Sequence, residues 1–356
     1  MRFAYTGSYT YESKNFNCYP QGDGVHVYSV SDDGLKWDEI QTVPESNPAF
    51  IGFDAKKRVV YVAQSNSPVP VTGIVAYSRD AETGKLTKMS KQLDLQRPIC
   101  CFSIHPSNRF MVAADFKGIV HVIALDENGA LDHVAHELAL PGELGPLPKD
   151  QKCSRPHHIP FDLSGNFLVI PDKGYDVVHL YRFDAENGEL VPIVHTPVRP
   201  ASCARHIAFH PNGRTVYMAA EYTSKIYVFD YDPEHSVLEK CQIISAERST
   251  YCGLYCKSSE IAVLPNGKFL YVSNRGDNTI GIFAIGDDGL LTPVAWQDTL
   301  GEIPRFFCMD EKGKYLYVGN QKSGTVAVFA IDAETGALTP RGKPLSVPCP
   351  TWILFA

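Results

Sequence analysis

The sequence lacks long apolar runs, clusters of basic residues and any sustained helical periodicity. No apolar stretch approaches the ~20 residues that a membrane-spanning helix needs, so we expect no membrane partner. The formal net charge is -7, and this argues against nucleic acid as a main partner because phosphate binding requires a basic face. Without helical periodicity, the expected building element is the β-strand.

The N-terminus also lacks the basic region and apolar stretch of a secretory signal peptide. Its first residues, MRFAYTGSYT, are typical of a strand instead. We therefore expect a cytoplasmic protein whose cysteines are thiols. Cys252 and Cys256 form a C-x3-C pair with no second spaced pair, and we interpret them as structural thiols rather than metal ligands.

What the sequence does contain is one short pattern repeated seven times. Each copy is a proline or small polar residue, an apolar run and, except at the C-terminus, a turn and a second apolar strand. The copies lie at 47–54, 97–106, 155–162, 203–211, 259–266, 303–310 and 349–356. Successive turns are about 50 residues apart, which is the repeat length of a solenoid or propeller rather than of two separate domains.

Each repeat continues with a third strand, an acidic and glycine-containing turn such as DAETG, and a fourth strand. Four strands in ~50 residues are typical of a β-propeller blade. The copy at 349–356 is a first strand with nothing after it, whereas 3–10 and 24–40 supply a second, third and fourth strand with no first. We therefore predict an all-β, seven-bladed β-propeller of four antiparallel strands per blade. It forms a single domain over 1–356, and both termini close the last blade.

The position of polar residues in the repeat predicts a site. The first strand of a blade lines the channel and the second runs back antiparallel to it, so residues seven or eight places before and after the turn share one rim. Polar residues occupy these places in four neighbouring blades: His157, Arg205, Glu221, Glu260, Asn274, Arg305, Arg275 and Gln321. Glu260 is one place out of register. His158 and His206 are expected to face the other side of their strands, packed between blades and donating to backbone.

These residues stand in segments that resemble the seven-bladed lactonase family, which includes bacterial 6-phosphogluconolactonases and the related 3-carboxymuconate-cyclising enzymes. The resemblance covers essentially the whole chain and is most specific at 145–174, 204–221, 259–280 and 304–321. It implies that His157, Arg205, Glu221 and Arg275 occupy active-site positions. The chain departs from the family pattern at Arg155 and Ala262, which replace histidines usual in relatives. Residues 11–23 and 66–72 also lengthen two loops. These departures affect the expected substrate more than the expected fold.

The leading hypothesis is hydrolysis of a sugar-acid lactone, with a small anionic lactone or carboxylate as substrate. Arg205, Arg275 and Arg305 would hold the anionic substituent and polarise the ester carbonyl. Glu221 would act as general base for water, or would orient His157 to do so. Glu260, Asn274, Arg305 and Gln321 are the expected substrate-binding residues. We expect no cofactor, no metal and a monomer.

Three other functions remain open from the residues. Lactonising cyclisation of a carboxymuconate needs the same arginine clamps and one proton donor. A non-catalytic binding platform would have little reason to gather arginines and Glu221 at one rim. A metal-dependent lactonase would use carboxylates and asparagines such as Glu260, Asn274 and Asn320, and the nearby arginines would oppose its divalent cation.

Overall fold

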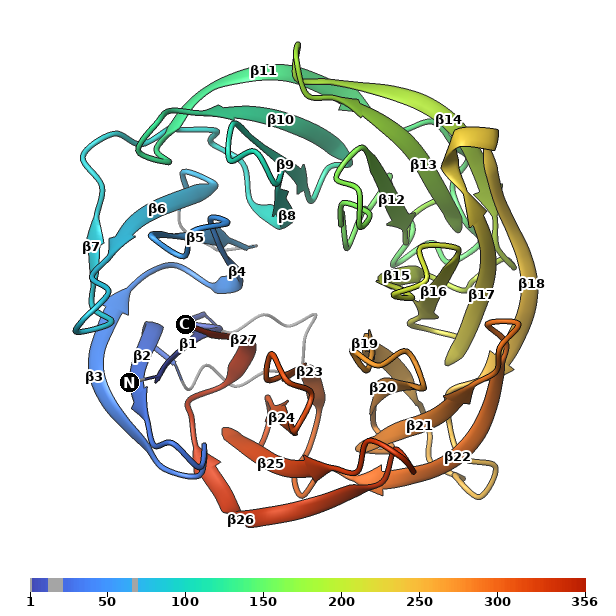
Figure 1. Cartoon of the computed structure of the whole chain (residues 1–356). Helices are drawn as coiled ribbons and strands as arrows, with labels where there is room; N and C mark the ends of the chain where they lie inside the picture. The colour runs from blue at the N-terminus through green and yellow to red at the C-terminus, as the bar shows by residue number, and fades with distance from the viewer. Residues whose placement is uncertain (1, 12–21, 66–69) are drawn as a thin grey trace.

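Seven antiparallel sheets stand side by side around a central channel in the computed structural model, which describes residues 2–11, 22–65 and 70–356 (Figure 1). The predicted propeller of seven four-stranded blades is confirmed. Residues 12–21 and 66–69, which make up most of the two lengthened loops, lie outside the described residues.

The strands of each blade follow one another from the channel outward in chain order, except in the last. The first three blades comprise β4 (Pro48–Phe53), β5 (Val59–Gln64), β6 (Ile74–Arg79) and β7 (Leu86–Lys88); β8 (Ile99–Ile104), β9 (Phe110–Asp115), β10 (Ile119–Leu125) and β11 (Leu131–Ala139); and β12 (Phe167–Asp172), β13 (Val177–Asp184) and β14 (Glu189–Pro197). The next three comprise β15 (Ala204–Phe209), β16 (Thr215–Ala220), β17 (Lys225–Asp232) and β18 (Val237–Ser245); β19 (Lys257–Val263), β20 (Phe269–Arg275), β21 (Thr279–Ile285) and β22 (Leu291–Asp298); and β23 (Pro304–Met309), β24 (Tyr315–Asn320), β25 (Thr325–Ile331) and β26 (Leu338–Ser346). A short 3-10 helix, η1 (Pro233–His235), precedes β18.

The last blade combines both ends of the chain, as the sequence predicts. Its order is β27 (Pro350–Phe355), β1 (Arg2–Ser8), β2 (Gly24–Val30) and β3 (Trp37–Pro44). The backbones of Phe3 and Ala356 exchange two hydrogen bonds, of 2.8 and 3.0 Å. Because the two ends of the chain pair within one blade, the ring closes without an unpaired strand edge between them.

The first strand of the third blade departs from regular geometry. Residues 155–162 pair with β12 only through the isolated bridges Pro156–Asp172 and Phe161–Leu168. Pro156 and Pro160 have no backbone N–H to donate to the ladder, which explains why this segment is extended without being a continuous strand.

Each regular first strand contains a β-bulge at the same place near its start. In the fourth blade, Ala204 lies opposite Ala220 and His206 opposite Ala219, so Arg205 is the extra residue. The corresponding extra residues in four other blades are Ala49, Cys100, Arg305 and Thr351. In the fifth blade, the register shifts between Ser258 and Ile261. A bulge re-aims the side chain of the extra residue, and all five named above line one pocket at this rim.

Apolar side chains fill the spaces between blades, and buried tyrosines join one blade to the next. The hydroxyl of Tyr61 on β5 donates to the carbonyl of Gly129 in the following blade at 2.7 Å, and Tyr217 donates to Gly289 at 2.9 Å. Gly129 has φ +83, and an added Cβ would lie 3.0 Å from the Tyr61 hydroxyl.

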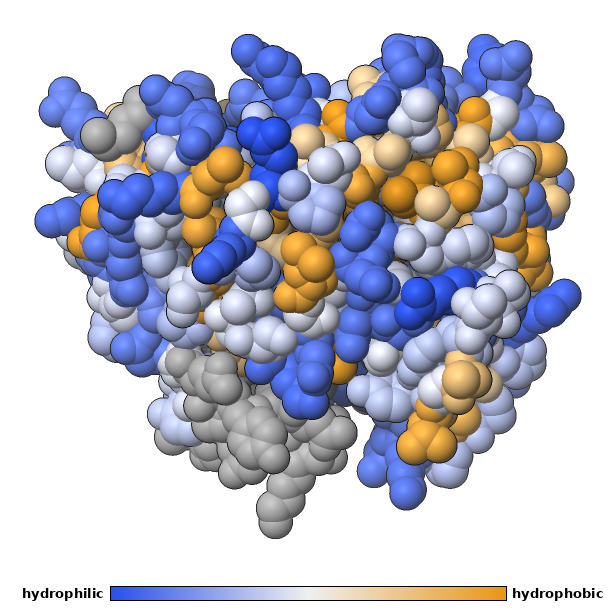
Figure 2. All heavy atoms as spheres, turned by 90° about the horizontal axis from the view of Figure 1, so that it is seen from below, coloured by the Kyte–Doolittle hydropathy of each residue, from blue (hydrophilic) through white to orange (hydrophobic). Residues whose placement is uncertain are grey.

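The outer surface in Figure 2 is mainly hydrophilic, with apolar residues in separate small groups. No helix in the described part of the chain has the length and apolar character needed to cross a membrane.

Tyr61→Phe is expected to lower the free energy of unfolding by about 1–3 kcal/mol, because the buried Gly129 carbonyl loses its donor while the ring still packs. Urea unfolding followed by fluorescence measures the change. Tyr251→Phe is the matched control: its hydroxyl bonds to the Tyr255 carbonyl on an exposed loop, and we expect a change below about 0.5 kcal/mol. Equal effects of the two substitutions would contradict the proposed role of the inter-blade bond.

Candidate active site

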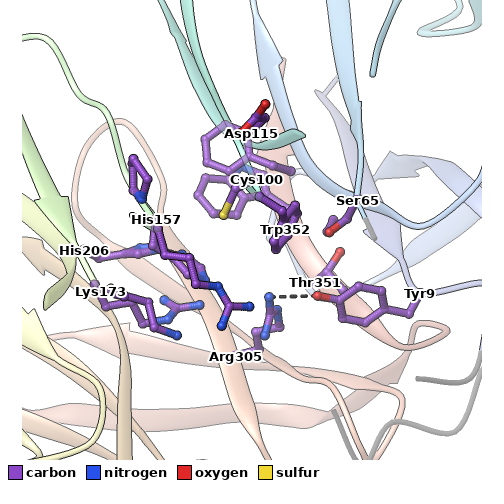
Figure 3. Close-up of a pocket in the computed structure, with 16 residues that line it drawn as sticks. Tyr9, Ser65, Cys100, Asp115, His157, Lys173, His206, Arg305, Thr351 and Trp352 are labelled. Carbon is purple, nitrogen blue, oxygen red and sulfur yellow. Dashed lines mark hydrogen bonds between the residues drawn. The ribbon is translucent and has the colours of Figure 1, made fainter. Parts of the chain in front are cut away.

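A pocket opens at the rim of the channel where the first strands begin and the second strands end. Its empty volume is about 630 Å³, with open solvent at the mouth included. The charged and imidazole side chains that line it are Asp115, Arg155, His157, Lys173, Arg205, His206 and Arg305. Figure 3 shows His157, His206 and Lys173 on one side, Tyr9, Ser65 and Thr351 on the other, and Arg305 between them.

An aromatic stack contributed by the C-terminal strand lines part of the pocket. Trp352 on β27 lies against Phe306, with ring centroids 3.9 Å apart, and against Phe50, with centroids 4.0 Å apart. The two phenylalanines come from β23 and β4, the first strands of the blades on either side. The closing strand therefore supplies part of the pocket as well as the last sheet.

Glu221 is the carboxylate around which cations gather. It directly follows β16, and its Oε2 bonds to the Lys173 ammonium and lies 3.5 Å from the Nε of Arg205. Its Oε1 is 3.1 Å from an Nη of Arg275. Burial alone would raise the pKa of Glu221, but the charges of Lys173, Arg275 and Arg205 hold it well below its usual range. Glu221 therefore stays ionised and binds three cationic side chains together.

Arg205 and Arg305 occupy equivalent bulge positions two blades apart, with different surroundings. Arg205 is only 2% exposed, and its Nη1 donates to the Ser259 carbonyl at 2.8 Å. Burial, followed by the charge of Arg275, lowers the pKa of Arg205 to about 9. Arg305 donates to the Tyr9 hydroxyl at 2.9 Å, and its guanidinium lies 5.3 Å from the Tyr9 ring centroid. Both arginines line the pocket.

His157 contacts a second histidine behind it. The Nδ1 of His157 is 3.3 Å from the Nε2 of His206, whose Nδ1 is 3.0 Å from the Oε1 of Glu260. Burial and the charge of Arg205 lower the pKa of both imidazoles well below the usual range. Both imidazole rings are therefore neutral at neutral pH. Burial also raises the pKa of the Glu260 carboxyl, to about 8.

The prediction for His206 is wrong, and the bulge explains why. Strict alternation places His206 opposite to Arg205, packed between blades and bonded to backbone. Because Arg205 is the extra residue of the bulge, His206 instead lines the pocket and bonds to His157 and Glu260. His158 does bond to backbone, but as an acceptor: its Nδ1 receives the Ile207 N–H at 3.1 Å.

The other sequence-predicted residues separate into two groups. His157, Arg205 and Arg305 line the pocket, and Glu221, Arg275 and Glu260 bond to lining residues or lie behind them. Asn274 differs from expectation: it is fully buried, its Nδ2 donates to the Ala246 carbonyl, and its Oδ1 accepts from Ser258. Both ends of the Asn274 amide are therefore bonded within the protein, away from the pocket lining.

Gln321 and Asn320 also lie outside the pocket lining. Gln321 is 2% exposed, and its Nε2 lies 3.8 Å from the Cys349 thiol. Asn320 is fully buried and donates to the Thr299 carbonyl at 2.8 Å. Of the trio considered for a metal, Glu260 bonds to His206 through Oε1, and the amide nitrogens of Asn274 and Asn320 donate to backbone carbonyls. No group of three or more potential His, Cys, Asp or Glu ligands occurs among the described residues.

Lys173 is the functional candidate that sequence reasoning missed. It follows β12 directly, lines the pocket and bonds to Glu221. Its place in the repeat was informative: Lys173 is eight residues after Gly165, as Glu221 is eight after Gly213. The residue before it, Asp172, sits at the seventh place and accepts bonds from the Arg155 and Gly174 backbone. Tyr9 and Trp352 in the lining carried no comparable signal, whereas Cys100 lies eight residues before its turn, as Arg205 and Arg305 do.

The chain is similar to known proteins over nearly its whole length. The family model described as "Lactonase, 7-bladed beta-propeller" matches residues 3–355. A 6-phosphogluconolactonase of Bacillus subtilis is 28% identical over 336 residues, 94% of each chain. An uncharacterised protein of Lactococcus lactis is 31% identical over 338 residues, covering 92% of this chain and 94% of the relative.

Solved structures share the whole fold. A periplasmic gluconolactonase of Pseudomonas aeruginosa superposes with a TM-score of 0.85 at 22% identity, covering 100% of this chain and 99% of the other. A protein from Lactobacillus plantarum gives 0.86 at 24% identity, covering 100% of both chains. At these identities the likeness concerns the fold. The family match extends over nearly the entire chain, and this protein belongs to the seven-bladed β-propeller lactonase family.

Proposed function

We propose that this lactonase hydrolyses an anionic sugar-acid lactone in the pocket, in the manner of a 6-phosphogluconolactonase. The observation that carries the proposal is the charge of the site. Five cationic side chains, Lys173, Arg155, Arg205, Arg275 and Arg305, stand against two carboxylates of lowered pKa, Glu221 and Asp115. Glu260 adds no full charge at neutral pH because its pKa is raised to about 8. The excess positive charge favours an anionic ligand.

The arrangement supports a division of roles among these residues. Lys173, Arg205 and Arg305 line the pocket, where they can bind the anionic group and stabilise the negative charge that develops on the lactone carbonyl. Glu221 and Arg275 stand behind them as an ion pair. A carboxylate held by three cations is a weak base, so the second sequence hypothesis is favoured: Glu221 organises the site and His157 accepts the proton of the attacking water.

His157 becomes a better base when substrate is bound. Burial and the charges of Arg205 and Lys173 lower its pKa. An anionic substrate brings negative charge close to those cations and offsets their effect, which raises the pKa of His157 toward the working pH. Activation of the base is thus coupled to binding of an anion.

The test is a pH-stat screen of phosphorylated and unphosphorylated aldonolactones, with carboxymuconates followed by loss of ultraviolet absorbance. We expect turnover of an anionic aldonolactone well above its spontaneous hydrolysis and weaker binding of the neutral analogue. Turnover of the muconate alone would move the assignment to a lactonising cycloisomerase. Turnover of neither class would favour a non-catalytic binding role.

We also propose that the enzyme is a cytoplasmic monomer. Nine cysteines are described, Cys252 and Cys256 included, and all nine are free thiols, which supports a reducing compartment. The blade completed by β27 and β1 closes the ring within one chain, so no partner strand is needed to complete it. Sedimentation of the protein used in the screen is expected to give the mass of one 39.4 kDa chain.

A further inference from the structure

Three side chains from three successive blades, the buried Glu260 and His206 and the half-buried His157, form a hydrogen-bonded chain that ends at the pocket. Glu260 lies on β19, His206 on β15, and His157 on the irregular segment 155–162. The Glu260 Oε1 to His206 Nδ1 distance is 3.0 Å, and the His206 Nε2 to His157 Nδ1 distance is 3.3 Å. Glu260 is 6% exposed and His206 1%, so little solvent competes for these bonds.

The backbone determines the direction of this chain. The Ile261 N–H donates to the same Glu260 Oε1 at 2.9 Å, so this oxygen is an acceptor. A proton on the Glu260 carboxyl would reside on Oε2, which is buried and has no hydrogen-bond partner among the described residues. Oε1 therefore accepts from His206 Nδ1–H when the carboxyl is ionised, and also when the carboxyl proton resides on Oε2.

The remaining protons follow from the first bond. A neutral His206 with its proton on Nδ1 has a lone pair on Nε2, and this lone pair accepts from His157 Nδ1–H. His157, also neutral, then has its lone pair on Nε2. We propose that Glu260 and His206 are positioning residues that hold His157 in this tautomer, the one in which Nε2 can accept a proton.

Neighbouring rings keep His206 in place. His158 stacks on it with ring centroids 4.7 Å apart and an interplanar angle of 23°, and the Trp352 centroid is 6.2 Å away. His158 is itself held by the Ile207 N–H. The low pKa values of His157 and His206, caused by burial and by Arg205, keep both rings neutral, which a defined tautomer requires. This inference rests on the proposed function in one respect: the proton that His157 accepts is taken to come from the attacking water.

Two substitutions at Glu260 separate the hydrogen bond from the charge. Glu260→Gln removes the carboxylate but keeps an oxygen that can accept from Ile261 N–H and His206 Nδ1–H. Glu260→Met has a similar length and no strong acceptor. Because both variants are uncharged, a difference between them reports the acceptor. His206→Phe, which keeps the ring stacking, supplies the same comparison should Glu260→Met fail to fold.

The first measurement is 15N NMR of histidine side chains without substrate, with His157 assigned by loss of its signal in His157→Gln. We expect the Nδ1-protonated tautomer of His157 in the wild type and in Glu260→Gln. In Glu260→Met or His206→Phe, the Nε2-protonated form should appear. His210→Gln is the control, because His210 bonds to the Gly267 carbonyl at a turn on the far rim. Nε2-protonated His157 in the wild type, or an unchanged tautomer in both disruptive variants, would overturn the proposal.

The second measurement is steady-state kinetics on the lactone found by the screen. Glu260→Met is expected to lose about 100-fold in kcat with KM nearly unchanged, while Glu260→Gln stays within about threefold of the wild type. A tautomer change without loss of kcat would overturn the positioning role. If no lactone is turned over but the NMR pattern holds, the proposed function fails while the assignment of the His157 tautomer stands.

Discussion

Glu221→Gln is expected to abolish lactone turnover and to lower the free energy of unfolding by about 3–5 kcal/mol. The substitution keeps the shape of the side chain but leaves Lys173, Arg205 and Arg275 packed together without their counter-ion. Their mutual repulsion displaces the groups that bind the substrate anion. Steady-state kinetics and urea unfolding measure the two losses.

The stability loss should depend on pH in a defined direction. The folded pKa of Glu221 lies well below the ordinary value of 4.5, so ionised Glu221 stabilises the protein fully above that value. Its contribution disappears as the pH falls through the lowered folded pKa. The difference between wild type and Glu221→Gln should therefore be constant near neutral pH and shrink in acid.

The matched control is Glu334→Gln. Glu334 pairs with Lys268 at 2.7 Å, but the two side chains are 78% and 52% exposed, so we expect a change within about 1 kcal/mol and unaltered turnover. Full activity of Glu221→Gln on the preferred lactone would contradict the role assigned to the cation cluster.

Arg205→Met is expected to reduce kcat/KM by about 100- to 1000-fold. The substitution removes a donor that lines the pocket and leaves the buried Ser259 carbonyl without its 2.8 Å bond. It also removes a charge that lowers the pKa of His157. The pKa of His157 in the variant therefore rises, and the acid limb of the kcat/KM profile moves to higher pH, because His157 must be neutral to accept a proton.

Arg214→Met serves as the control for this substitution. Arg214 is exposed in the turn after β15, and its backbone N–H, not its side chain, bonds to Asn212. We expect its kcat/KM and pH profile to match the wild type. An Arg205→Met enzyme with reduced activity but an unmoved acid limb would show that Arg205 binds substrate without acting on the proton acceptor.

The fold was predictable because it depends on features that repeat. Seven copies of a strand pattern predict seven blades. The copy at 349–356 lacks its later strands and the N-terminal segment lacks a first strand, so the two complete one blade and close the ring. The rim of the pocket was predictable for the same reason, since antiparallel first and second strands bring fixed positions together. His157, Arg205 and Arg305 were found at the pocket on this basis.

The distribution of roles was harder to predict because it depends on one bulge per blade. Alternation along a regular strand puts His206 on the wrong side, and only the extra residue at Arg205 brings it to His157. Asn274 and Lys173 show the same limit. Asn274, seven places after its turn, bonds to the Ala246 carbonyl, whereas Lys173, eight places after its turn, lines the pocket, and nothing in the residue types separates them.

The sequence by itself determined the seven-bladed ring, its closure by both termini and the end of the channel that carries the site. These follow from strand length, turn spacing and direction, which are local properties repeated along the chain. Only the tertiary structure decided that Lys173 joins Arg205 and Arg275 around Glu221, and that Glu260 reaches the pocket through His206. Apart from the Arg205–Glu221 pair, which lies within one blade, those contacts join residues about 50 apart on neighbouring blades, and their geometry depends on how bulged strands pack around a common axis.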